Sequence, residues 1–457
     1  MKLGKVLGEI IEDANSPSFD VFKFKSSEAV PPGAFVSTTL SNDSFLLGRV
    51  TKALGKNGAK VYEADSLEQG FTENGIVTFF EPTDTARPDA QVFFTEEEVI
   101  ARSVGFGTNN RSSIDMGRAG SCRALLRPEI LNRHVFIGGT TGSGKSFATS
   151  ILIEELGRLK IPVVVMDSQG EYAALAQDLQ GEILKPGRDY TVRLSSLTEE
   201  EAAAMASSLK GTLGYELFQF SFLALKKEIF EGRRAEFGLF DLIKRMEMDA
   251  PILGADGYQM RLATSRTDAS VRRHEFLGAL GKKLDWTALL KRGVPVCVDC
   301  SRLELLQVQL ITGATMRELQ RIRLDNKVPS YVIVLDEAHL LVPADTETPC
   351  KQIIRENVRI GRHYGICVVL ITQNPLDIDR KTISQCNTRL IFALEPDQLF
   401  ALQGVKADIA EDTFRKIPKM PRGTCLLSGT HETVRHAVTV RIRSDRKTRH
   451  GQSPTSA

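Results

Sequence analysis

The first part of the chain alternates hydrophobic and polar positions in short segments. Between residues 1 and about 95, Gly, Pro, Asn and Asp separate these segments, which include residues 19–24, 34–37, 45–50 and 76–80. A period of two is typical of strands that bury one face. About six such strands within residues 1–95 predict a small β-barrel. The pattern weakens over residues 81–125, which are rich in Pro, Asp, Gly and Asn, and we place a linker at 96–125.

The pattern changes at about residue 126. Nearly continuous hydrophobic runs occur at residues 135–137, 162–166, 295–298, 331–335 and 366–371. Such runs are typical of strands buried on both faces, in a parallel sheet covered by helices. Helical stretches lie between them, so residues 126–440 predict an α/β domain. Three further helical stretches at 199–209, 216–230 and 240–248 interrupt the alternation and predict a helical insertion over 198–290. Residues 441–457 form a basic tail.

Composition narrows the classes of protein. Hydrophobic residues make up 42% of the 457 and charged residues 25%, as in ordinary globular proteins. The hydrophobic runs are too short to span a membrane, and the first residues include acids rather than an apolar signal core. We therefore expect a cytoplasmic protein without a membrane partner. Seven scattered cysteines favour reduced, buried thiols. Cys297 and Cys300 have the spacing of half a zinc site but lack a second pair, which favours a structural role.

Charge is distributed unevenly along the chain. Residues 1–100 hold 9 basic and 16 acidic side chains, a net charge of −7, whereas the remainder carries +9. This asymmetry indicates that any contact with a polyanion involves the second part of the chain.

A glycine-rich loop supplies the strongest chemical motif. Residues 139–146, GTTGSGKS, follow the predicted strand 135–137 and precede a predicted helix at 147–159. This context is typical of a phosphate-binding loop, in which glycines let backbone N–H groups face the nucleotide and the helix N-terminus adds partial positive charge. We expect Lys145 to contact the β- and γ-phosphates of ATP and Ser146 to bind Mg²⁺. The nucleotide-binding candidates are Gly139, Thr140, Thr141, Gly142, Ser143, Gly144, Lys145 and Ser146.

Acidic and amide side chains follow other predicted strands. Asp336 and Glu337 end the strand 331–335, where Asp336 is expected to reach Mg²⁺ and Glu337 to polarise the attacking water. Gln373 ends the strand 366–371 and is expected to contact the γ-phosphate or that water. For Asp167 and Glu171, a role beside the nucleotide or a neighbouring subunit and a role as solvated loop acids both stay open. His339 is at least as consistent with packing as with catalysis.

Taken together, these segments resemble the HerA branch of the HerA/FtsK ATPases. The resemblance is carried by residues 132–146, 166–172, 334–339, 360–365, 371–379 and 384–388, and by the basic end 440–451. It implies a RecA-like P-loop ATPase core with an N-terminal barrel. It also implies a homo-hexameric ring that uses ATP and Mg²⁺ to move along double-stranded DNA with an effector protein, commonly a nuclease. Gln452 stands where that family often has a second glycine, which weakens the expected nucleotide contact of the tail.

The resemblance also implies cations that act on a neighbouring subunit. Arg362 matches the position of the arginine finger and Arg133 a second trans-acting position, with Arg359 as a fallback for the finger. A surface arginine paired with an acid is the plain alternative for each. DNA contacts are expected from basic residues of the insertion, for which a solvated helix face is an equally good interpretation: Arg233, Arg234, Arg261, Arg266, Arg272, Arg273, Lys282 and Lys283.

Several functions are compatible with these features. The favoured one is a DNA translocase that works with an effector in DNA end processing or anti-phage defence. The alternative from another class is an ATP-binding ring scaffold that assembles and controls an effector without processive translocation. A monomeric DEAH-type helicase would need a second RecA-like domain. A type IV secretion ATPase shares the core, but the barrel and the basic tail argue against it.

Overall fold

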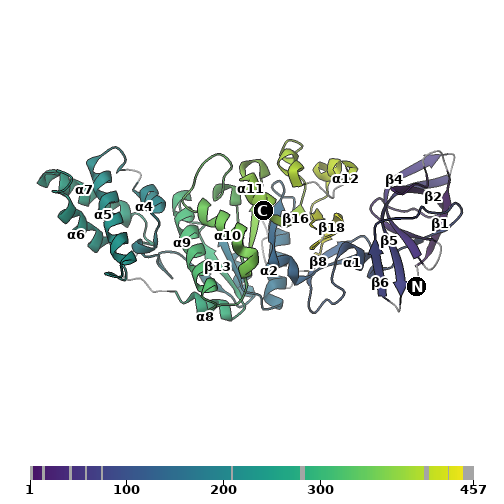
Figure 1. Cartoon of the computed structure of the whole chain (residues 1–457), viewed down its shortest axis with the longest axis horizontal. Coiled ribbons are helices and arrows are strands. Elements are labelled where there is room, and N and C mark those ends of the chain that lie inside the picture. Colours follow the sequence, from purple (N-terminus) through teal and green to yellow (C-terminus); the bar gives the residue numbers. More distant parts are fainter. Residues whose placement is uncertain are drawn as a thin grey trace, which may run out of the picture. The chain divides into compact units, whose positions relative to one another are not determined.

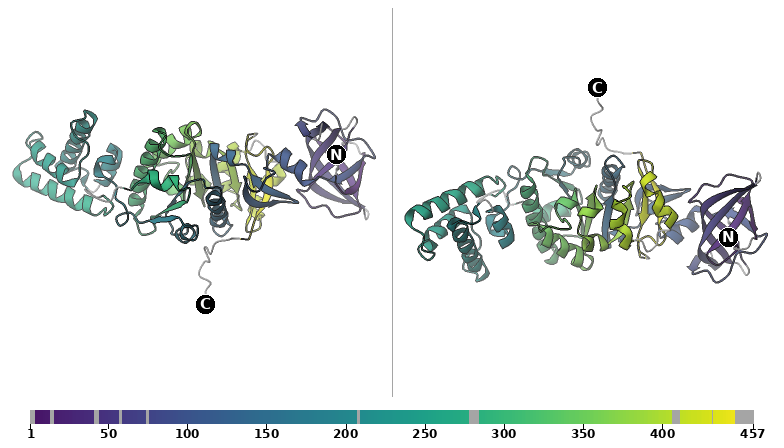
Figure 2. Two further views of the ribbon diagram at one scale, coloured as in Figure 1. Left: turned by 90° about the horizontal axis from the view of Figure 1, so that it is seen from below. Right: turned by 90° about the horizontal axis from the view of Figure 1, so that it is seen from above.

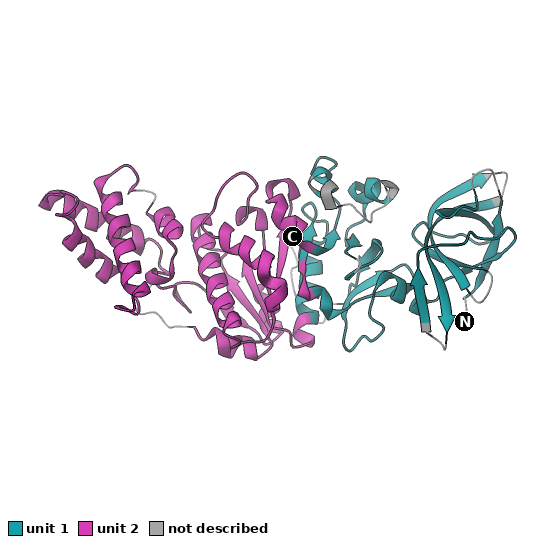
Figure 3. Cartoon of the chain, viewed as in Figure 1, with its two compact units in different colours: residues 1–130, 135–155, 387–446 teal, residues 131–134, 156–386, 447–457 magenta. Residues whose placement is uncertain are grey.

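The computed structural model describes residues 4–12, 16–40, 44–56, 59–73, 76–206, 209–277, 284–405, 411–430 and 432–445. The chain folds as two compact units (Figure 3). Unit 1 comprises residues 1–130, 135–155 and 387–446, and unit 2 comprises residues 131–134, 156–386 and 447–457. Among the described residues, no helix combines the length and hydrophobicity that crossing a bilayer requires.

Unit 1 contains a closed antiparallel barrel (Figure 1). Its ring follows the order β2-β1-β7-β3-β4-β5, β5 pairs back to β2, and β6 extends the sheet beside β5. Phe22, Phe24, Leu46 and Tyr62 fill the interior. At Gly48 a Cβ atom would lie 2.5 Å from the Phe22 ring, so a bulky residue would not fit there. The predicted small barrel is confirmed, with strands β1 (Val6–Ile11), β2 (Val21–Ser26), β3 (Phe35–Thr39), β4 (Ser44–Lys56), β5 (Ala59–Glu73), β6 (Ile76–Phe80) and β7 (Gln91–Phe94).

The segment predicted as a linker is folded instead. It contains α1 (Glu97–Val104) and the antiparallel strands β8 (Ile114–Ala119) and β9 (Cys122–Leu126). A bulge between Asp115 and Arg118 breaks the regular alternation of β8. Since alternation is the signal by which a strand is recognised in a sequence, this irregular strand escaped prediction.

The remaining strands of unit 1 follow one another in a sheet. Their order is β10-β16-β17-β18-β8-β9, and the pairs from β16 to β9 are antiparallel. The bounds are β10 (His134–Gly138), β16 (Cys386–Ile391), β17 (Thr424–Ser428) and β18 (Val438–Ile442), with helices α2 (Lys145–Arg158) and α12 (Glu411–Lys416).

Unit 2 contains the parallel strands that the hydrophobic runs predicted. The order is β12-β13-β11-β14-β15, all parallel. Every residue of β11, β14 and β15 is buried, as expected for strands covered on both faces. The strands are β11 (Val163–Asp167), β12 (Glu182–Leu184), β13 (Pro295–Asp299), β14 (Tyr331–Leu335) and β15 (Ile366–Thr372). The helices are α3 (Ala173–Asp178), α8 (Trp286–Lys291), α9 (Leu305–Leu324), α10 (Lys351–Tyr364) and α11 (Arg380–Ser384).

The helical insertion of unit 2 is confirmed as well. Both views of Figure 2 show its helices as a bundle set beside the rest of the unit. The helix α7 was missed because its sequence is polar and only weakly amphipathic, although Asp256 and Gln259 form a capping box at its start. The bounds are α4 (Glu199–Met205), α5 (Leu213–Phe230), α6 (Leu239–Asp249) and α7 (Gly257–Arg272). The domain boundaries at residues 95, 125 and 440 stay predictions.

Candidate nucleotide site

The glycine-rich loop of unit 1 joins β10 to α2. Gly142 and Gly144 have φ angles of +76° and +118°, which residues with a side chain rarely adopt. A Cβ atom on Gly139 would lie 2.6 Å from the Cβ of Phe392 and 2.7 Å from Ser143 Oγ. Three glycines of the motif are therefore required by backbone conformation or by close packing.

Hydrogen bonds fix the loop between neighbouring segments of unit 1. The Thr140 N–H donates to the Ala393 carbonyl at 2.7 Å, and the Gly423 N–H donates to the Ser143 carbonyl at 2.9 Å. The Ser143 hydroxyl donates to the Thr140 carbonyl at 2.7 Å. The contact with Gly423 joins the loop to the turn before β17, a neighbour that no sequence motif indicates.

Lys145 is buried, with 8% of its surface exposed. Its Nζ donates to the Thr140 carbonyl at 3.0 Å, across the loop from its own position at the start of α2. The ammonium group is thus held over the loop, where it adds a full positive charge to the partial charge of the helix N-terminus. Ser146 follows it and is partly exposed, and Thr141 and Gly142 are exposed.

In unit 2, Asp336 directly follows β14 and is 6% exposed. Burial, followed by the neighbouring carboxylates of Glu337, Asp167 and Glu171, raises the pKa of Asp336 to about 8. The Ser168 hydroxyl lies 3.5 Å from Asp336 Oδ2. Several carboxylates thus lie close together around the buried Asp336. A hard divalent cation prefers carboxylate and hydroxyl oxygens as ligands, and its charge would stabilise this group of acids.

Glu337 is held in an uncommon backbone conformation. Its φ and ψ angles are +48° and +49°, in the left-handed region. Gln373, after β15, donates from Nε2 to Glu337 Oε1. The other oxygen, Oε2, is buried and accepts no hydrogen bond from the described residues, and His339 Nδ1 lies 3.4 Å from it. The structure therefore brings Glu337, Gln373 and His339 together and leaves one carboxylate oxygen for a further donor.

Asp167 organises a loop rather than facing solvent. It is fully buried, and its two carboxylate oxygens accept the N–H groups of Gly170, Glu171 and Tyr172 at 2.8–3.0 Å. Burial raises its pKa despite these hydrogen bonds. The side chain of Glu171 is exposed. Asp167 is therefore not the solvated loop acid that the sequence left open.

The three arginines predicted to act on a neighbouring subunit belong to two segments of unit 2. Arg362 and Arg359 are on α10, one turn apart, and both are exposed. Arg133 directly precedes β10 and is partly exposed. Its carbonyl accepts a hydrogen bond from the Cys367 thiol. An exposed position on α10 suits a cation that acts on a neighbouring molecule.

Of the basic candidates in the insertion, several are paired with acids. Arg233 pairs with Glu231, Arg272 with Asp268, and Arg234 with both Glu228 and Asp241. Arg261, Arg266 and Arg273 are exposed, whereas Lys282 and Lys283 lie outside the described residues. Cys297 and Cys300 are buried, and burial raises the pKa of both thiols.

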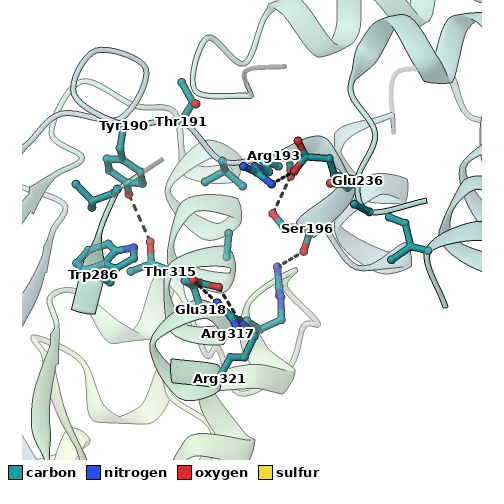
Figure 4. Close-up of a pocket in the computed structure, with 16 residues that line it drawn as sticks. Tyr190, Thr191, Arg193, Ser196, Glu236, Trp286, Thr315, Arg317, Glu318 and Arg321 are labelled. Atoms are coloured by element: carbon teal, nitrogen blue, oxygen red, sulfur yellow. Dashed lines mark hydrogen bonds and ion pairs between the residues drawn. The ribbon is translucent and has the colours of Figure 1, made fainter. Parts of the chain in front are cut away.

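A separate cavity of about 570 Å³ lies between the insertion and α8–α9 of unit 2 (Figure 4). None of the predicted site residues lines it. Its arginines have carboxylate partners, since Arg193 pairs with Glu236 and Arg321 with Glu318. Arg317 pairs with the buried Glu201. The charges of this cavity are thus largely balanced within the protein.

Comparison with known proteins identifies relatives of the chain. Residues 114–319 match the family described as "Helicase HerA, central domain", and residues 318–434 match "Helicase HerA-like C-terminal". A DNA double-strand break repair helicase HerA from Sulfurisphaera tokodaii is 22% identical over 66% of this chain and 64% of its own length. That of Pyrococcus furiosus is 24% identical over 67% and 66%. The chain thus spans slightly less than two thirds of these relatives.

Solved structures share the fold. VirB4 of Thermoanaerobacter pseudethanolicus superposes with a TM-score of 0.59 at 15% identity, over 74% of this chain and 98% of its own. The plasmid coupling protein TrwB, in complex with ADP and Mg²⁺, gives 0.51 at 12% identity, over 78% and 94%. These likenesses confirm the predicted α/β P-loop ATPase fold. With its P-loop, its acidic strand and both HerA segments in order, the chain belongs to the HerA-type ATPases.

Proposed function

We propose that this chain binds ATP through residues 139–146 and hydrolyses it with Asp336 and Glu337. The observation that carries it is the buried acidic cluster around Asp336, whose pKa is raised to about 8 and which calls for a cation. The loop geometry and the membership in the HerA-type ATPases support the same conclusion.

Mg²⁺ fits the donor set of these residues. The proposed ligands are the Ser146 hydroxyl and the Asp336 carboxylate, which are hard oxygen donors. Bound Mg²⁺ would offset the repulsion among the acidic side chains and the phosphates. Lys145 would move from the Thr140 carbonyl to the β- and γ-phosphates.

Glu337 is proposed to orient the attacking water. Its free Oε2 can accept a proton or a hydrogen bond, while Gln373 holds Oε1 and fixes the direction of the carboxylate. In phosphoryl transfer, orientation of the nucleophile matters more than covalent chemistry. His339 beside Oε2 would then position the carboxylate rather than contact ATP.

A neighbouring subunit is proposed to complete the site. Arg362 on the exposed face of α10 would stabilise the charge that develops on the transferred phosphoryl group, and Arg133 would assist. Arg359 is the fallback. An arginine that acts in trans requires a ring or another closed oligomer, and we propose a homo-hexamer.

We propose that hydrolysis drives movement along double-stranded DNA with an effector protein, such as a nuclease, in DNA end processing or anti-phage defence. The relatives from S. tokodaii and P. furiosus carry the description of DNA double-strand break repair helicases, which supports this assignment. The positive charge outside residues 1–100 is consistent with a DNA partner.

The proposal is tested by ATP hydrolysis with and without linear duplex DNA. We expect duplex to stimulate the wild-type protein and Glu337→Gln to abolish turnover in both conditions. Glu98→Gln, which removes an exposed acid on α1 outside this cluster, is the control and should retain turnover. An active ATPase that is indifferent to DNA would favour the scaffold alternative, and a protein without ATPase activity would contradict the proposal.

A further inference from the structure

A row of arginines crosses the sheet of unit 1. Arg441 of β18 lies directly opposite Arg118 of β8, and Arg118 lies opposite Arg123 of β9. Residues that oppose each other on adjacent strands project from the same face of the sheet. Since neighbouring strands are about 4.8 Å apart, the three side chains start from positions that span about 10 Å. We call these three residues the arginine row.

The sheet itself does not explain the arginine row. Like charges placed directly opposite on neighbouring strands destabilise a sheet. An ion pair with Asp115 offsets the positive charge of Arg123. Arg118 and Arg441 are exposed, and neither forms an ion pair with a carboxylate of the described residues, although Arg118 donates to the Ser121 carbonyl at 2.5 Å.

Arg443, only two residues beyond Arg441, provides a contrast on the same strand end. It is 10% exposed and pairs with Glu154 at 2.6 Å and with Glu155 at 3.1 Å. The structural arginine at this strand end thus forms ion pairs with two glutamates. The exposed Arg118 and Arg441 form no such ion pair with the described residues, which indicates that they bind a negatively charged ligand.

A cavity of about 510 Å³ in unit 1 adjoins the arginine row. Of the described residues that line it, four are cationic, namely Arg49, Arg118, Lys416 and Arg441, and none carries a carboxylate. The Arg49 guanidinium donates to the Ala437 carbonyl at the start of β18. The cavity of Figure 4, by contrast, holds arginines that are paired with acids. The cleft beside the arginine row therefore attracts anions.

We infer that Arg118 and Arg441 bind consecutive phosphates of the DNA backbone, an inference that rests on the proposed DNA-dependent function. Backbone phosphates follow one another every 3.4 Å of axis on each DNA strand, so two guanidinium groups whose side chains start about 4.8 Å apart can meet more than one of them. The planar guanidinium group matches phosphate oxygens with two parallel hydrogen bonds. These contacts position the duplex without reading its sequence.

The test measures binding of the full-length protein to a fluorescent linear duplex by anisotropy, at several salt concentrations. The slope of log K against log salt is negative, and each lost phosphate contact makes it shallower by about 0.9. The double variant Arg118→Gln/Arg441→Gln should therefore reduce the magnitude of the slope by about two. Affinity at low salt should fall at least about tenfold. Arg118→Lys/Arg441→Lys keeps the charges and should keep the slope. Arg102→Gln, which removes an arginine paired with Glu98, should change neither quantity.

Two further measurements on the same variants make the outcome decisive. Binding of a fluorescent ATP analogue and the mass by light scattering should match the wild type.

An unchanged affinity and slope in the double Gln variant would overturn the inference, while wild-type binding of duplex would leave the proposed function intact. A double variant that loses its oligomeric state would identify the row as a subunit contact and overturn the inference too. Displacement of duplex by inorganic phosphate at constant ionic strength would reassign it as a site for the free ion. Failure of the wild type to bind duplex would instead contradict the proposed function.

Discussion

At the scale of single residues, Glu337 combines a chemical and a conformational requirement. Its position after a hydrophobic strand was predictable, but its left-handed backbone was not, because that conformation depends on the turn that follows β14. Gln373 then fixes one oxygen and leaves the other without a hydrogen bond from the described residues. We expect Glu337→Gln to lower ATP turnover by at least about 100-fold, since a positioned base contributes about that much. Binding of a fluorescent ATP analogue should persist, and retained turnover in this variant would contradict the assigned role.

Asp167 shows the opposite case, an acid whose role is structural. Its carboxylate accepts three backbone N–H groups of the loop after β11. Asp167→Ala leaves these donors without their charged acceptor, and we expect the free energy of unfolding to fall by about 2–4 kcal/mol. Urea denaturation measures this change, with the exposed Glu171→Ala as the control at about 0.5 kcal/mol or less. Equal stabilities of the two variants would refute the structural role.

At the scale of elements, Arg443 ties the end of β18 to the helix that follows the phosphate loop. Both of its partners, Glu154 and Glu155, lie on α2 and are buried. Arg443→Gln removes this cation from two buried carboxylates, which costs about 3 kcal/mol of unfolding free energy. The control Arg102→Gln breaks an exposed pair and should cost at most about 1 kcal/mol. A loss no greater than that of the control would show that β18 and α2 are not coupled in this way.

The first residue of β10 gives the protein a dependence on pH. His134 is buried, its Nδ1 accepts the Val368 N–H at 3.1 Å, and burial lowers its pKa from 6.5 to about 4. Below pH 6.5 the unfolded chain takes up the proton first, so stability is lost as the pH falls from 6.5 to about 4. The slope is at most about 1.4 kcal/mol per pH unit.

His134→Asn keeps an acceptor for Val368 but cannot titrate. We therefore expect its stability, measured by urea denaturation at several pH values, to fall less steeply than that of the wild type between pH 6.5 and 4. Parallel pH profiles for the two proteins would contradict this origin of acid sensitivity.

Elements with strong patterns were predictable, and irregular ones were not. The buried strands β14 and β15 match the predicted runs within one residue at each end, because continuous hydrophobic sequence leaves few alternatives. The bulged strand β8 and the polar helix α7 lack such a signal. The contacts of the loop with Ala393 and Gly423 were not predictable, since they join segments far apart in the sequence and follow from the strand order.

At the scale of the whole molecule, the residues that we propose as catalytic belong to both compact units, and we propose that each ATP site takes them from two protomers. The loop with Lys145 belongs to unit 1, and Glu337 and Gln373 belong to unit 2. Arg362 lies exposed on α10 and is proposed to serve the neighbouring protomer. Activity should therefore depend on assembly, which light scattering and ATP turnover over a dilution series would measure together. Turnover per protomer that persists in the monomer would contradict this dependence.

The central claim is that neighbouring protomers share each ATP site, and mixing two inactive variants tests it most directly. Glu337→Gln and Arg362→Ala should each be inactive alone. In an equal mixture, about one quarter of the interfaces would pair an intact Glu337 with an intact Arg362, so turnover should recover to about that fraction of wild type. A mixture of Glu337→Gln with Lys145→Ala should stay inactive, because both residues are contributed by the same protomer. Equal inactivity of the two mixtures would contradict the shared site.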